Sequence, residues 1–103
     1  MAKTKKEYVA RFLADAEPAR CFWCSDGKIV CNLADLPEAL QNMSDETFNY
    51  HASNEKNDFC NWVHDVIGDK NLAANLKKIK NRIVAAKKIK ERVEYLRYLN
   101  RID

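Results

Sequence analysis

Residues 57–68 read Asn-Asp-Phe-Cys-Asn-Trp-Val-His-Asp-Val-Ile-Gly, and this stretch decides the fold class. Its large apolar residues recur at the i, i+3, i+4, i+7, i+8 spacing of one helical face: Phe59, Trp62, Val63, Val66 and Ile67. We therefore expect a helix over about 57–67, with Phe59 and Trp62 in the core. Asn57 and Asp58 are suited to its N-cap. Gly68 is suited to a left-handed C-cap because it has no Cβ.

The chain beyond Gly68 contains neither Gly nor Pro, so it favours helix to about residue 99. Asp69 is the expected cap, and the predicted inward stripe is Leu72, Leu76, Ile79, Ile83, Ala86, Ile89, Val93 and Leu96. The pattern fits one long helix or two helices joined near Asn81. We expect this stripe and that of the Trp62 helix to form the core together.

Before residue 57, local signals predict shorter elements. Thr4 and Glu7 form a capping box for a helix over about 5–16, whose inward residues would be Tyr8, Phe12, Leu13 and Ala16. Asp26-Gly27 predicts a β-hairpin turn between two short apolar runs. Asp35 with Glu38, and then Ser44, predict two further helix starts. The expected fold is a single, mainly α-helical domain over residues 1–103, with one short N-terminal hairpin and a long basic C-terminal helix.

Length and composition limit the functions that this chain can have. With 103 residues, two Gly and two Pro, it is too short for a multidomain enzyme and too poor in turn residues for a barrel. No run reaches the roughly 18–20 apolar residues of a membrane span, and no signal peptide follows the basic start. We expect a cytoplasmic protein without a membrane partner, in which the four cysteines are reduced thiols or metal ligands.

Charge is divided unequally along the chain. Residues 1–69 hold seven basic and twelve acidic side chains, whereas residues 70–103 hold eleven basic and three acidic ones. The basic half contains the predicted contact residues Lys77, Lys78, Lys80, Arg82, Lys87, Lys88, Lys90 and Arg92. Clustered cations favour nucleic acid through counterion release, but they also fit a protein partner, the acidic part of the chain or a solvated face. Tyr95, Tyr98 and Leu99 suit association between helices, including self-association.

The cysteines are the sharpest chemical signal. Cys21-Phe-Trp-Cys24 has the spacing of two metal ligands, and zinc or an iron–sulfur cluster would need further ligands from Cys31, Cys60, His51 and His64. A two-residue turn at Asp26-Gly27 would place Cys24 and Cys31 on one face of the hairpin, as a ligand pair or a disulfide. Strand alternation would separate Cys21 from Cys24. The alternative is that the cysteines are buried, metal-free thiols.

Two histidines offer further chemistry. Cys60 and His64 stand at i, i+4, so the imidazole could lower the pKa of the thiol for nucleophilic attack. Because Asp65 adjoins His64 and should point elsewhere, no group is expected to orient the imidazole, and we do not expect an enzyme. His51 fits a structural role, hydrogen-bonded to a backbone carbonyl or to a carboxylate such as Asp58.

Several spaced motifs give the chain a family resemblance: Phe48-x-x-His51, Asn57-Asp58-Phe59-x-x-Trp62-Val63 and Leu72-Ala73. Over about residues 20–80 the chain resembles an uncharacterised family of small bacterial and archaeal domains, which also has an aromatic hairpin segment. The resemblance implies a compact domain and no assigned activity. Relatives usually lack these cysteines, so a metal site would be peculiar to this chain.

These observations predict a non-catalytic binding module whose contact surface is the basic C-terminal helix and whose partner is nucleic acid or protein. The alternative is a small metalloprotein that binds zinc or an iron–sulfur cluster.

Overall fold

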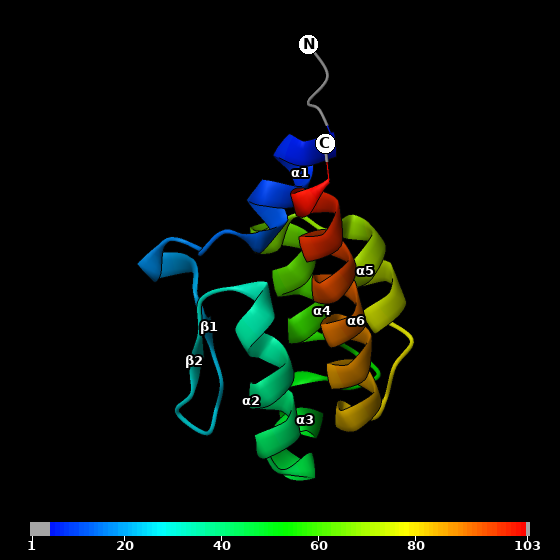
Figure 1. The fold of residues 1–103 in the computed structure, drawn as a ribbon. Helices are drawn as coiled ribbons and strands as arrows, with labels where there is room; N and C mark the ends of the chain where they lie inside the picture. Colours follow the sequence, from blue (N-terminus) through cyan, green and yellow to red (C-terminus); the bar gives the residue numbers. More distant parts are fainter. Residues whose placement is uncertain (1–4, 103) are drawn as a thin grey trace.

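The computed structural model describes residues 5–102 and is predominantly helical (Figure 1). The helices are α1 (Lys5–Leu13), α2 (Leu36–Asn42), α3 (Asp45–His51), α4 (Asp58–Trp62), α5 (Lys70–Leu76) and α6 (Arg82–Arg101). Strands β1 (Phe22–Trp23) and β2 (Ile29–Val30) form an antiparallel hairpin. The expected helical fold with one hairpin and a long C-terminal helix is confirmed. Thr4, the predicted cap of the first helix, lies outside the described residues.

Helix α6 is the axis on which the other helices are arranged. It packs against α2 on one side and α5 on the other, and α1 lies beside its C-terminal half (Figure 1). The buried face of α6 consists of Ala85, Ala86, Ile89, Val93 and Leu96. These residues belong to one apolar cluster that extends from Val9 in α1 to α6 and includes residues of every helix and both strands. None of the helices within residues 5–102 is long and apolar enough to cross a membrane.

Side-chain caps separate the helices, largely as the sequence predicts. Ser44, Asn57, Asp69 and Asn81 each accept hydrogen bonds from backbone N–H groups in the first turn that follows them. Because Asn81 caps α6, the basic half forms two helices and not one. Asp69 is 1% exposed, so this cap is also a buried charge.

Three expectations about these helices are wrong. Asp35 does not cap α2 with its side chain; its own N–H is donated to Asn32 Oδ1, which starts a 3-10 turn over Leu33–Asp35. Helix α1 ends at Leu13 and buries Val9, while Tyr8 is exposed. Ile83 is also exposed, because in the first turn of α6 the core side is occupied by Ala85 and Ala86.

Gly68 ends the Trp62 helix in the predicted left-handed conformation, with φ of 92°. The residues before it, Val63–Ile67, form a π-helical turn, and the N–H groups of Gly68 and Asp69 both donate to the Val63 carbonyl. A Cβ on Gly68 would stand 3.4 Å from the Arg11 guanidinium. Glycine is needed here because residues with a Cβ rarely adopt this φ.

The hairpin has a register that differs by one residue from the expected one. Phe22 pairs with Val30 and Trp23 with Ile29, because the loop has three residues, 25–27, and not two. Gly27 adopts φ of 95°, which is typical of a three-residue loop with a bulge at the glycine. This register is favoured by packing, because Phe22 is buried and stacks on Phe59 at 5.0 Å between ring centroids.

Candidate functional site

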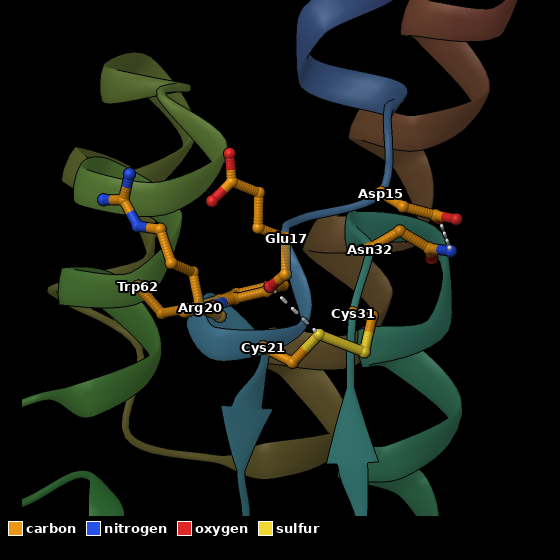
Figure 2. Close-up of a disulfide and its surroundings, with 7 residues drawn as sticks. All are labelled: Asp15, Glu17, Arg20, Cys21, Cys31, Asn32 and Trp62. Carbon is orange, nitrogen blue, oxygen red and sulfur yellow. Dashed lines mark hydrogen bonds between the residues drawn. A yellow bond between two sulfur atoms is a disulfide. The ribbon is translucent and has the colours of Figure 1, made fainter.

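Cys21 and Cys31 stand directly opposite each other on the hairpin and form a disulfide (Figure 2). Their Cα atoms are 4.4 Å apart, the spacing of a cross-strand pair without mutual backbone hydrogen bonds. The expectation that both are thiols or metal ligands is therefore wrong, as is the shared face of Cys24 and Cys31. The first error follows from the reducing compartment that the sequence led us to expect. The second follows from the three-residue loop, since a shift of one residue moves each side chain to the other face.

Contacts on both sides hold the disulfide end of the hairpin in place. Trp62 Nε1 donates to the Arg20 carbonyl at 2.9 Å, which joins the segment before β1 to α4. After β2, Asn32 donates to Asp15 at 2.9 Å (Figure 2). The N–H of Ala16 donates to the Cys31 carbonyl at 2.6 Å. The disulfide therefore lies at the junction between the hairpin and the segment that leaves α1.

The two remaining cysteines are free thiols in unreactive surroundings. Cys24 is buried, and its pKa is raised to about 11 by burial and by the neighbouring Asp26. Cys60 is half-buried, and its Sγ donates to the Ala73 carbonyl at 3.1 Å. Burial also raises the pKa of Cys60, although the charge of Lys77 opposes this shift. A nucleophilic thiol needs a lowered pKa, so neither cysteine has the environment of a catalytic one.

Both histidines have other partners. Nε2 of the buried His51 accepts the Ser25 N–H at 2.9 Å, and Nδ1 lies 3.0 Å from Asp58 Oδ2, the structural role that the sequence suggests. Because Nε2 is the acceptor, Nδ1 carries the proton that Asp58 accepts. His64 Nδ1 lies 2.8 Å from Asp65, contrary to the expectation that Asp65 points elsewhere, and no hydrogen bond joins His64 to Cys60.

The predicted metal ligands are thus dispersed. Two form a disulfide, Cys60 donates to a backbone carbonyl, and both histidines are hydrogen-bonded to aspartates. Within residues 5–102, no group of three or more His, Cys, Asp or Glu side chains is placed to hold a metal ion. The predicted ligands are therefore not gathered at one metal site in this structure.

Two of the predicted contact residues are bonded inside the fold. Arg92 forms a two-point ion pair with Asp69, with Nε 2.7 Å from Oδ2 and Nη2 3.0 Å from Oδ1. Arg82 pairs with Asp45 at 2.7 Å and donates to the carbonyls of Leu40 and Gln41. The acidic first part of the chain therefore neutralises some of the basic second part, as one of the sequence alternatives expects.

The other six predicted contact residues are exposed lysines: Lys77, Lys78, Lys80, Lys87, Lys88 and Lys90. None has an ion-pair partner among the described residues. They do not form one face. Lys77, Lys78 and Lys80 lie at or beyond the end of α5, Lys88 lies on the α5 side of α6, and Lys90 lies on the α2 side. The charge is therefore spread over the segment that follows α5 and over α6, and it is not concentrated in one stripe.

The exposed part of α6 has a pattern of its own, away from the buried face, and its residues Lys88, Glu91 and Tyr95 also border α5. Val84, Lys88, Glu91, Tyr95 and Tyr98 follow one another at alternating spacings of four and three residues, which is the spacing of a coiled-coil seam. Val84, Tyr95 and Tyr98 are each about half exposed. We call these five residues the outer seam. Its heptad spacing is visible in the sequence, but only the structure shows which residues of the helix are exposed.

A hollow of about 500 Å³ lies between α2 and α6. Its charged lining residues balance one another: Glu38 and Glu94 against Lys90 and Arg97. It therefore gives no electrostatic preference for an anion or a cation.

A family of unknown function, DUF5752, matches residues 18–99. The chain belongs to DUF5752. Searches of curated proteins and of solved structures found no match. The DUF5752 match includes the hairpin, the disulfide and the outer seam, whereas α1 precedes it. Membership agrees with the resemblance and assigns no activity, so a functional proposal must come from the geometry.

Proposed function

We propose that this DUF5752 domain is a non-catalytic association module that pairs with a second copy of itself through the outer seam of α6. The observation that carries the proposal is the coiled-coil spacing on a solvent-facing helix. A helix that contacts the core through one face needs an apolar stripe on that face alone. Here α6 carries a second stripe outside the buried face, in which Val84, Tyr95 and Tyr98 are each about half exposed.

Charge selects the orientation of the two copies. In an antiparallel pairing centred between Ile89 and Lys90, Lys88 faces Glu91 of the second copy, and Val84 faces Tyr95 of the second copy. At the flank of the seam, Lys87 then lies beside Glu94 of the second copy. A parallel pairing would instead place Lys88 against Lys88 and Glu91 against Glu91, which is unfavourable. The symmetry also closes the assembly as a dimer.

Sedimentation equilibrium over a wide concentration range tests the pairing. We expect a reversible dimer that is weakened by Lys88→Glu, because two acidic groups then face each other. Glu91→Lys should weaken it equally by placing two cations together. The double variant Lys88→Glu/Glu91→Lys should restore the dimer, since the antiparallel contacts are re-formed with reversed charge. Lys78→Glu is the matched control, because it makes the same charge change outside the seam.

A monomer at every concentration would overturn the proposal. So would equal weakening by Lys78→Glu, which would indicate a general effect of net charge. Failure of the double variant to restore the dimer would exclude the antiparallel arrangement.

A second candidate function is nucleic-acid binding, favoured by the six exposed lysines without ion-pair partners. It predicts that affinity for an oligonucleotide falls steeply with salt and decreases with each lysine removed. Fluorescence anisotropy with Lys78→Ala and Lys87→Ala measures this. Binding that is absent or insensitive to salt would contradict it.

A further inference from the structure

A second hollow, of about 330 Å³, is lined by none of the outer-seam residues. Its walls are the loop over residues 53–57, the exposed side of α4 and the segment that follows α5. Its volume is at the lower end of the range for small-molecule sites. It contains none of the predicted metal ligands except Cys60.

The walls of this hollow are fixed by hydrogen bonds. Ser53 donates its N–H to the Lys56 carbonyl at 2.7 Å, and its hydroxyl accepts the N–H groups of Glu55 and Lys56. Asn57 caps α4 through Cys60 and also approaches the Leu76 carbonyl at 3.5 Å, so it joins the loop to α5. A hollow with such walls is organised before any ligand arrives, which lowers the entropy cost of binding.

The lining has an excess of positive charge. It holds three lysines, Lys56, Lys77 and Lys80, against one carboxylate, Glu55. Lys56 is partly neutralised, since its Nζ is 3.2 Å from Asp58. Lys77 and Lys80 have no ion-pair partner within residues 5–102. Two unpaired ammonium groups on one small concave surface favour an anion with two charges.

The remaining lining residues are polar and not aromatic. The side chains of Asn54 and Asn61 are exposed, and neither forms a hydrogen bond with another described residue. Their amides can donate to and accept from hydroxyl groups. No aromatic ring lines the hollow, so there is no surface on which a nucleobase would stack. Cys60 lines the same hollow as Lys77, and the charge of Lys77 opposes the rise of the Cys60 pKa that burial causes.

We propose that this hollow binds a small phosphomonoester with a hydroxyl-bearing body, its phosphate held by Lys77 and Lys80. The amide groups of Asn54 and Asn61 contact the hydroxyls. The proposal is independent of the dimer, because none of the residues that line the hollow belongs to the outer seam.

Titration of the ¹⁵N-labelled protein with glucose 6-phosphate tests the site by NMR. We expect saturable amide shifts confined to residues 53–61 and 77–80, and binding at least about tenfold weaker for glucose, because a charge-assisted contact is lost. Lys77→Ala and Lys80→Ala should each weaken binding by about tenfold or more. Both side chains are exposed, so these variants should fold normally.

Lys78→Ala is the matched control, because Lys78 is an exposed neighbour that does not line the hollow. Its affinity for glucose 6-phosphate should equal that of the unmodified protein. As a second readout, bound ligand should slow alkylation of Cys60 by iodoacetamide. The absence of saturable shifts would overturn the proposal. Equal affinity for glucose, or equal loss in Lys78→Ala, would also overturn it, since binding would then not depend on the phosphate or on this hollow.

Discussion

Replacing Arg92 with leucine would leave a buried carboxylate without its counter-ion. Asp69 is 1% exposed, and its oxygens accept three hydrogen bonds: two from Arg92 and one from the N–H of Leu72 at 3.1 Å. Arg92→Leu removes two of these three and retains the apolar part of the side chain. Removing one partner of a buried ion pair costs about 3–5 kcal/mol. A domain of this size is stable by about 5–15 kcal/mol, so the loss is a large fraction of the total.

Urea-induced unfolding followed by circular dichroism measures this effect. For an m-value of about 2 kcal/mol/M, the midpoint should fall by about 2 M. Arg97→Leu is the matched control, because Arg97 is an exposed arginine of α6 without an ion pair among the described residues, and it should change stability by less than about 0.5 kcal/mol.

The double variant Asp69→Asn/Arg92→Leu separates the lost contact from the isolated charge. Because asparagine carries no charge and can still accept the Leu72 N–H, the double variant should be more stable than Arg92→Leu alone. If Arg92→Leu costs less than about 1 kcal/mol, or if the double variant is less stable than the single one, the buried carboxylate does not depend on Arg92 as argued.

Three further predictions concern the hairpin and the end of the Trp62 helix. Cys21→Ala/Cys31→Ala should lower the free energy of unfolding by about 2–3 kcal/mol, because the unfolded chain loses a short closed loop; unchanged urea midpoints with and without reductant would contradict this. Since the pKa of Cys24 is raised to about 11, the folded state holds this proton more tightly than the unfolded state. Stability should therefore be complete below about pH 8.5 and fall by about 3 kcal/mol as the pH rises to 11; Cys24→Ala should lack this part of the decline. Gly68→Ala should lower the free energy of unfolding by about 1–2 kcal/mol because alanine is strained at φ of 92°. A thermal midpoint equal to that of the unmodified protein would contradict the left-handed conformation of residue 68.

Features that depend on neighbouring residues were predictable from the sequence. The caps at Ser44, Asn57 and Asp69 and the left-handed Gly68 follow from local hydrogen bonding and backbone sterics, and the structure confirms them. The break at Asn81 was one of two alternatives, because the apolar stripe continues across it and favours neither.

The hairpin register was not predictable in the same way. Asp26-Gly27 fits loops of two or three residues equally well, and strand propensity is the same in either register. The choice depends on tertiary packing, since the observed register places Phe22 against Phe59, 37 residues away. The disulfide follows from that choice, because only this register sets Cys21 opposite Cys31.

The ion pairs of the basic half show why charge counts alone did not identify a contact surface. The sequence does not distinguish among the eleven cations of residues 70–103. In the structure, Arg82 forms an ion pair with Asp45, and Arg92 forms one with Asp69. What remains is a set of lysines spread from the end of α5 along α6, and α6 also exposes about half of each of Val84, Tyr95 and Tyr98. Such a surface favours another helix over a phosphate backbone, because a polyanion gains little from apolar contacts, whereas a second α6 can bury the apolar groups and match Lys88 with Glu91.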